Sequence, residues 1–158
     1  MEKIITGLVK SKKGVLALLT EKLAEMDINL RSVAVAETEG EPLAYMTLVA
    51  DIDADEIEEM NRELLKLDIV ESLQYLAAGD HYERELLLVK LSIEENKLSH
   101  IMQIAEVFRA QVAGVGHKTI TLEYVGQTDQ LDGLIKMLKP FGIVALARTG
   151  RTALKKDD

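Results

Sequence analysis

The chain repeats the same order of predicted elements twice, and this repeat limits the folds that it can adopt. From about residue 3 to 76, and again from about residue 83 to 149, the pattern predicts strand, helix, strand, strand, helix, strand. This order is typical of the ferredoxin-like topology, an antiparallel sheet with two helices on one face. We therefore predict an α+β fold built from two tandem ferredoxin-like βαββαβ units.

The first copy shows the periods of both element types. Asp53 and Asp55 stand where an acidic helix start is favoured. Strands are predicted from alternating or β-rich segments at residues 3–10, 28–36, 43–51 and 69–76. Helices are predicted from apolar residues that recur every three or four positions, namely Val15, Leu16, Leu19, Leu23 and Met26, and then Ile57, Met60, Leu64 and Leu67.

The second copy shows the same kinds of helix and strand pattern. We expect Thr128 or Asp129 to cap its second helix, and Pro140 with Gly142 to end that helix. Apolar residues at helical spacing predict its first helix around Ile101, Ile104, Ala105 and Phe108. Its strands are predicted at residues 84–93, 112–115, 119–125 and 143–147.

Charge is distributed unequally between the two halves. Residues 1–77 carry 8 Lys/Arg and 16 Asp/Glu, which gives −8, whereas residues 78–158 carry 11 of each, which gives zero. We assign residues 1–77 to a first domain and residues 81–158 to a second, whose last residues, 150–158, we expect to be a loose polar tail. The acidic first half repels phosphate backbones, so we expect no nucleic-acid partner.

The amino-acid composition excludes several kinds of chemistry and of targeting segment. The 158 residues include no cysteine, so the chain has no disulfide, no thiolate nucleophile and no cysteine-ligated metal. The first residues contain too short an apolar run for a signal peptide, and no stretch approaches membrane-spanning length. We expect a cytoplasmic protein that contacts no membrane.

The second strand of a ferredoxin-like unit lies at a sheet edge, here residues 29–36. This segment is apolar at Val33 and Val35 and contains no proline, so its free edge can pair with another chain. We predict a homodimer with one sheet continuous across two first units. Aggregation through the same edge is the alternative.

The turn at residues 11–15 leads from the first strand into the first helix. A helix start offers unpaired backbone N–H groups and a partial positive charge, which can hold the carboxylate of a small ligand. Gly14 would let such a ligand approach the backbone closely. An ordinary strand–helix turn explains the same residues and stays open as the alternative.

This turn, followed by Ile28-Asn29-Leu30, resembles the ACT domain, an amino-acid-sensing module. Four segments of the second half extend the likeness, at residues 81–90, 106–109, 131–132 and 147–150. Together they resemble the signature segments of the small regulatory subunit of acetolactate synthase (acetohydroxyacid synthase). The resemblance covers nearly the whole chain in order.

The resemblance implies a function without a catalytic site in this chain. The family's small subunit binds the catalytic subunit, raises its activity and confers feedback inhibition by a branched-chain amino acid, often valine. The catalytic subunit carries thiamine diphosphate, magnesium and usually FAD, so we expect no cofactor on this chain. By position, the effector-binding residues would be Ser11, Gly14, Val15 and Leu16 of one chain, with Asn29, Val33 and Val35 of the other.

Several positions depart from the family pattern. The family usually has Asn where this chain has Ser11, Gly where it has Asp27, and Arg where it has Leu18 and Tyr45; Ala110 replaces another common Gly. An amide offers two donors and an acceptor, whereas serine offers one hydroxyl. We therefore predict a weakened or altered effector response, with activation of the catalytic subunit retained.

Other charged and metal-type residues have simpler interpretations. His81, His100 and His117 lack the convergent spacing of metal ligands, so we expect no metal site. The acidic run at residues 51–56 lacks the glycine and terminal glutamate of a calcium loop, and an acidic helix start explains it. The residues 83–85 are either a salt-bridged strand entrance or part of a dimer or inter-domain contact.

The basic residues near the C-terminus, Arg148, Arg151, Lys155 and Lys156, either dock a catalytic subunit or form a solubilising tail. Two further functions compete with the regulatory subunit. A free-standing tandem amino-acid sensor would use both units on another partner. A small enzyme would need an acid, base or nucleophile converging in a pocket, and the sequence shows no such set.

Overall fold

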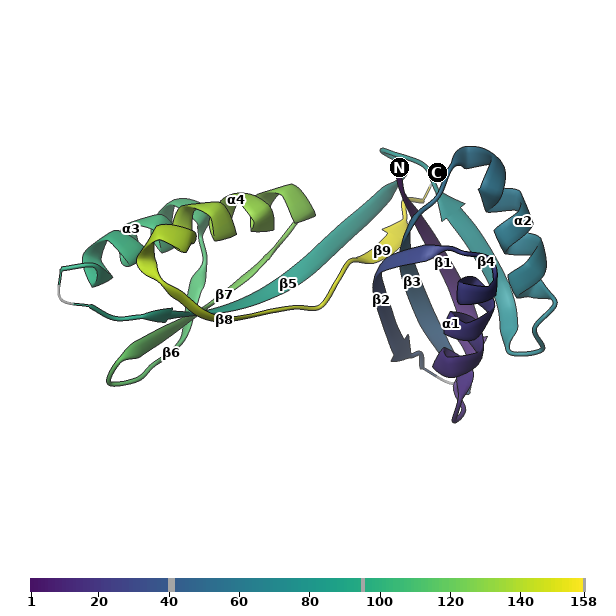
Figure 1. Ribbon diagram of the computed structural model, residues 1–158, viewed down its shortest axis with the longest axis horizontal. Helices are drawn as coiled ribbons and strands as arrows, with labels where there is room; N and C mark the ends of the chain where they lie inside the picture. Colours follow the sequence, from purple (N-terminus) through teal and green to yellow (C-terminus); the bar gives the residue numbers. More distant parts are fainter. Residues whose placement is uncertain (40–41, 95, 158) are drawn as a thin grey trace. The chain divides into compact units, whose positions relative to one another are not determined.

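The computed structural model describes residues 1–39, 42–94 and 96–157, and it divides the chain into two compact units (Figure 1). Residues 1–82, together with the segment that starts at Gly150, form the first unit, and Glu83–Thr149 form the second. Each unit contributes four strands to an antiparallel sheet with two helices on one face, and a short strand at residues 152–155 joins the second sheet as a fifth strand. The predicted α+β fold of two βαββαβ units is therefore confirmed.

The first unit places its second strand at a sheet edge, as predicted. The spatial order of its strands is β2-β3-β1-β4, and all neighbours pair antiparallel. Its elements are β1 (Glu2–Lys10), α1 (Val15–Glu25), β2 (Asn29–Glu37), β3 (Leu43–Asp51), α2 (Ala54–Leu65) and β4 (Val70–Leu76). Within this unit β2 therefore keeps one side of its backbone free of strand pairing.

The core of the first unit lies between the sheet and its two helices. Side chains alternate between the faces of a strand, so every second residue of β1 and β3 points to the helices. Apolar residues three or four positions apart on α1 and α2 meet them. The fully buried members of this core include Ile5, Leu19, Leu23, Met46, Leu48, Met60 and Leu64.

The two helices of the first unit begin in different ways. Asp53 is the N-cap of α2, and its backbone N–H donates to Glu56 Oε2 at 2.7 Å, so the predicted acidic helix start is present. No side chain caps α1, whose N-cap is Gly14. After α1 the chain turns through Asp27 in the left-handed region, with φ of 57°.

The C-terminal segment differs from the prediction. A loose tail belonging to the second domain is expected from its polar composition, but the structure forms a strand, β9 (Thr152–Lys155), that packs on the first unit. The Ala153 N–H donates to Thr47 Oγ1 at 3.2 Å, and the Tyr45 hydroxyl donates to the Ala153 carbonyl at 2.7 Å. Ala153 is buried in a small cluster with Ile4, Val49 and Leu76. The segment therefore covers part of the sheet face that the helices leave open.

The second unit has the strand order β6-β7-β5-β8. Its second helix starts differently from the prediction, because Gln127 is the N-cap and its N–H donates to Gln130 Oε1 at 3.0 Å. A 3₁₀ turn at Lys139–Phe141 and Gly142, with φ of 82°, end that helix as expected. The elements are β5 (His81–Ser92), α3 (Leu98–Phe108), β6 (Gln111–Val115), β7 (Thr119–Gly126), α4 (Thr128–Leu138) and β8 (Ile143–Arg148).

The core of the second unit is smaller, and its outer strands are exposed. The residues that α3, α4 and the sheet bury together include Leu87, Leu91, Ile101, Ile120, Leu122, Leu131, Leu134 and Leu138. Every residue of β6 is exposed. In the described part of the chain no helix is long and apolar enough to cross a membrane.

The left-handed backbone at Asp27 predicts a stabilising substitution. An L-residue with a side chain is disfavoured at positive φ, although aspartate tolerates it better than most. We expect Asp27→Gly to raise the free energy of unfolding by a few tenths to about 1 kcal/mol. The free energy of unfolding is measured by urea denaturation, with circular dichroism as the signal. Glu25→Gly, placed in the last turn of α1, is the matched control and should destabilise instead; a loss of stability in both variants would contradict the interpretation.

Candidate effector site and a charged cluster

The turn between β1 and α1 borders a cavity of about 430 Å³ in the first unit. The cavity lies beside the end of β2, so the helix start and the edge strand share it. Its size lies within the range of small-molecule sites. The lining residues are Val9, Lys10, Ser11, Lys12, Gly14, Val15, Leu16, Ala17, Val35, Ala36, Glu37 and Ala44.

The start of α1 provides the electropositive side of this cavity. Gly14 has φ of 85°, a backbone conformation that favours glycine, and the first turn of α1 contains no acidic residue. In contrast to α2 and α4, α1 has no capping box. The backbone N–H groups of a helix start and the helix dipole favour an anionic group at this end.

A carboxylate and several apolar groups complete the cavity. The Ser11 hydroxyl donates to Glu37 Oε1 at 2.7 Å, so the turn and the end of β2 are joined across it. Val9, Val35 and Ala44 contribute apolar walls. The cavity therefore combines a site for a carboxylate, an acceptor for an ammonium group and apolar surface, which are the three parts that an aliphatic amino acid presents.

The structure brings together five of the seven predicted effector residues. Four of them, Ser11, Gly14, Val15 and Leu16, lie on the turn and the start of α1, and Val35 lies on β2. Asn29 and Val33 lie on β2 outside the cavity of a single chain. Their predicted role depends on a second chain and stays a prediction.

The departures from the family pattern occupy different places. Only Ser11 lines the cavity. Leu18 is an exposed residue of α1, and Tyr45 lies on the opposite sheet face, where it bonds the C-terminal segment. Asp27 lies in a backbone turn. Strand alternation and helical periodicity point these positions to different faces, so among them only Ser11 reaches the cavity of a single chain.

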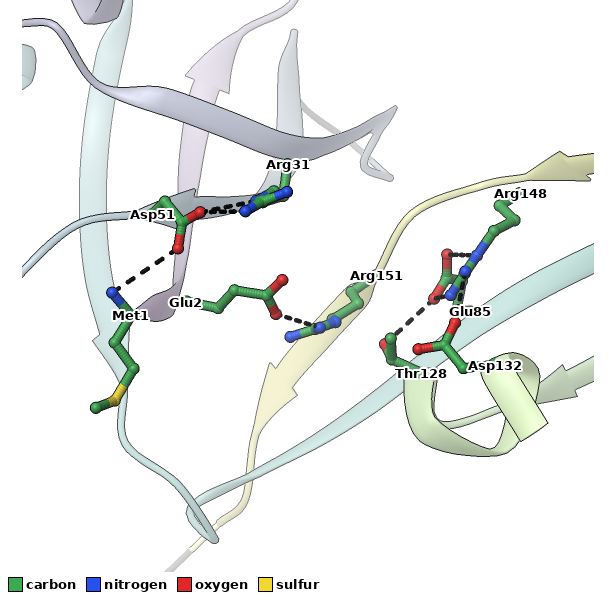
Figure 2. A network of polar contacts seen from close by, with 9 residues as sticks. All are labelled: Met1, Glu2, Arg31, Asp51, Glu85, Thr128, Asp132, Arg148 and Arg151. Carbon is green, nitrogen blue, oxygen red and sulfur yellow. Dashed lines mark hydrogen bonds and ion pairs between the residues drawn. The ribbon is translucent and has the colours of Figure 1, made fainter. Parts of the chain in front are cut away.

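A charged cluster links three elements of the second unit (Figure 2). Arg148, at the end of β8, donates from Nε to Glu85 Oε1 at 2.8 Å and from its Nη2 to Oε2 at 2.9 Å. The same arginine donates to Asp132 of α4 at 2.7 Å, and the Thr128 hydroxyl donates to Glu85 Oε2 at 3.2 Å. The hydrogen bond to Glu85 is the main cause that raises the pKa of Arg148.

The cluster bears on two alternatives that the sequence leaves open. The Glu85 side chain is only 6% exposed, so residues 83–85 do include a salt-bridged strand entrance. Arg148 belongs to this cluster and not to a free basic tail. Arg151 pairs with Glu2 at 2.5 Å, and Lys156 donates to the Gly79 carbonyl at 2.8 Å.

The edge strand of the first unit carries its own ion pair. Arg31 of β2 donates from Nε and Nη2 to Asp51 Oδ2 at 2.8 and 2.5 Å (Figure 2). This hydrogen bond is the main cause that lowers the pKa of Asp51. The acidic run therefore ties β2 to the end of β3 and starts α2. Among residues 1–39, 42–94 and 96–157, no group of three or more His, Asp or Glu is arranged to hold a metal.

Comparison with known proteins assigns both units. Residues 84–157 match the family model described as the small subunit of acetolactate synthase, and residues 5–72 match an AHAS small subunit-like ACT domain. The acetolactate synthase small subunit of Aquifex aeolicus is 33% identical over 98% of this chain and 81% of the relative. The chain belongs to the acetolactate synthase small-subunit family.

Two further relatives match this chain over nearly its whole length. The acetolactate synthase small subunit of Bacillus subtilis is 31% identical over 99% of this chain and 91% of its own length. The crystal structure of the Thermotoga maritima small subunit superposes with a TM-score of 0.93 at 26% identity, covering 100% and 99% of the two chains. The family is that of a regulatory subunit, and membership implies no catalytic role for this chain.

The charged cluster predicts a large effect of one substitution in this family member. Arg148→Met removes the cationic partner of a buried carboxylate, which is expected to cost about 3 kcal/mol or more of unfolding free energy. Lys97→Met is the matched control, because its pair with Glu94 is exposed (40% and 59%) and is worth less than about 1 kcal/mol. Urea denaturation compares the two, and equal losses would contradict the role assigned to Arg148.

Proposed function

We propose that the chain binds the acetolactate synthase catalytic subunit in the cytoplasm, raises its activity and makes it responsive to a branched-chain amino acid. Membership of the small-subunit family supports the partner. The cavity beside the start of α1 supports the effector, and it is the observation that carries this part of the proposal. Thiamine diphosphate, magnesium and FAD belong to the catalytic subunit in this proposal.

The cavity matches the groups of a branched-chain amino acid. The uncapped start of α1 receives the carboxylate, and Glu37, already bonded to Ser11, receives the ammonium group. The aliphatic side chain lies against Val9, Val35 and Ala44. The bound amino acid would displace water from the cavity. Its two charged groups and its side chain would each meet a complementary part of the wall.

A second chain completes this site in the proposal. Pairing through the free edge of β2 forms a homodimer with a continuous sheet, and it places Asn29 and Val33 of one chain toward the turn of the other. Light scattering should therefore give twice the 17.5 kDa mass of one chain at micromolar concentration. A mass of one chain under the same conditions would contradict the dimer.

Regulation requires that the effector distinguish two states of the complex. A ligand that binds both states equally shifts nothing, whereas a coupling of roughly 1–3 kcal/mol gives an effect of about 5- to 150-fold. Because the effector site includes the free edge of the first sheet, we propose that the effector changes how the two paired chains present themselves to the catalytic subunit. This mechanism needs no catalytic group in the regulatory chain.

Reconstitution tests the proposed function. The purified chain is added to the catalytic subunit of the same organism, and acetolactate formation from pyruvate is followed with and without valine. A clear rise in rate supports the regulatory subunit, and a reduced rate with valine supports the effector site. If the chain neither forms a complex nor raises the rate, the tandem amino-acid sensor becomes the better interpretation.

Ser11 predicts weak binding of the effector. Replacing it by asparagine, the residue usual in the family, adds a donor at the cavity. We expect Ser11→Asn to tighten valine binding about fivefold, the effect of one added hydrogen bond worth about 1 kcal/mol. Calorimetry measures the dissociation constant, with Ser99→Asn on the exposed face of α3 as control. Tight valine binding by the unaltered chain would contradict the prediction.

A further inference from the structure

A second hollow, of about 470 Å³, lies between α3 and α4 of the second unit. Apolar side chains form most of its surface, and the ring of His100 stacks on Phe141 with centroids 6.3 Å apart. The residues that line this α3–α4 groove are His100, Gln103, Ile104, Val107, Phe108, Lys136, Met137, Pro140 and Phe141. The groove is part of neither the cavity of the first unit nor the charged cluster.

The rim of the α3–α4 groove exposes large apolar side chains. Val107 is 80% exposed and Met137 is 51% exposed, while Met102 of the same helix α3 is 40% exposed. Between Leu98 and Phe108 the only acidic or basic side chain besides His100 is Glu106. A surface helix normally presents charged or polar residues to water, so this exposed apolar surface indicates a site that another protein covers.

The charge of the groove indicates the chemistry of its partner. Lys136 is the one lysine or arginine among the residues that line the groove, and no carboxylate lines it among the described residues. Neither Lys136 nor the nearby Lys139 takes part in an ion pair in the described part of the chain. An apolar hollow with an unpaired ammonium group on its rim is complementary to an apolar anchor flanked by carboxylates.

The same charge disfavours a second copy of this chain as the occupant. In a two-fold contact the same patch faces itself, so Lys136 of one chain would approach Lys136 of the other. Such a contact would add no carboxylate from the groove to compensate, and like charges in an interface cost free energy. The occupant therefore comes from a protein of different surface chemistry.

We propose that the α3–α4 groove docks an amphipathic segment of the acetolactate synthase catalytic subunit, with aliphatic or aromatic anchors in the groove and acidic residues at Lys136. This inference rests on the proposed function, which supplies the partner, and it assigns the contact to the second unit. Amphipathic segments in apolar grooves are a recurrent mode of recognition, in which a few buried anchors supply most of the affinity.

Two substitutions test the docking site in the full chain. Val107→Asp places a carboxylate on the apolar rim, and Lys136→Glu reverses the rim charge; both positions are exposed, so folding should be unaffected. Val115→Asp and Lys118→Glu make the same changes at exposed positions of the same unit outside the groove. Affinity for the catalytic subunit is measured by titration calorimetry, with circular dichroism and light scattering on every variant.

The expected result separates this inference from the proposed function. Val107→Asp should weaken binding at least tenfold, Lys136→Glu several-fold with a shallower salt dependence, and the two controls less than twofold. If the unaltered chain binds but the groove variants bind like the controls, the docking site is wrong and the proposed function stands. If the unaltered chain does not bind, both fail. A lower mass of Val107→Asp in light scattering would assign the groove to a second copy and overturn the inference.

Discussion

Helices cover only one face of each sheet, so the other face and the sheet edges must be covered in some other way. A sheet face or edge that stays bare exposes apolar side chains or unpaired backbone groups. In the first unit the chain itself covers part of the second face, since Ala153 of β9 packs with Ile4, Val49 and Leu76. The edge strand β2 has no such cover within one chain, and the proposed homodimer supplies it.

In the second unit, ion pairs join the ends of the elements, whereas in the first unit apolar packing of β9 serves this purpose. Its small core lies under α3 and α4, while the entrance of β5, the end of β8 and the start of α4 meet in the cluster around Glu85 and Arg148. Ion pairs of this kind cost desolvation and specify geometry more than they stabilise. The bidentate pair joins β5 to β8 through two residues that are 63 positions apart in sequence.

Periodicity was sufficient to predict the order, type and sheet edges of nearly all elements, because each strand and helix carries its own apolar pattern. It could not predict β9, in which a single alanine is the buried residue, nor the cap at Gln127, because Thr128 and Asp129 are the better capping residues by type. Arg148 was grouped with the C-terminal basic residues because its partners are distant in sequence. For the proposed effector site, the turn at Ser11 and Gly14 was predictable from its position between strand and helix. The contribution of Glu37 was not, because its hydrogen bond to Ser11 joins residues 26 positions apart in sequence.

We propose a division of function in which the first unit binds the effector beside α1 and β2, and the second unit contacts the catalytic subunit through α3 and α4. Hydrogen–deuterium exchange on the chain alone, with saturating valine, and with the catalytic subunit tests this division in one experiment. The account predicts that valine slows exchange at residues 11–17 and in β2, and that the catalytic subunit slows exchange in α3 and α4. Valine protection confined to the second unit, or protection by the catalytic subunit that leaves α3 and α4 unchanged, would contradict it.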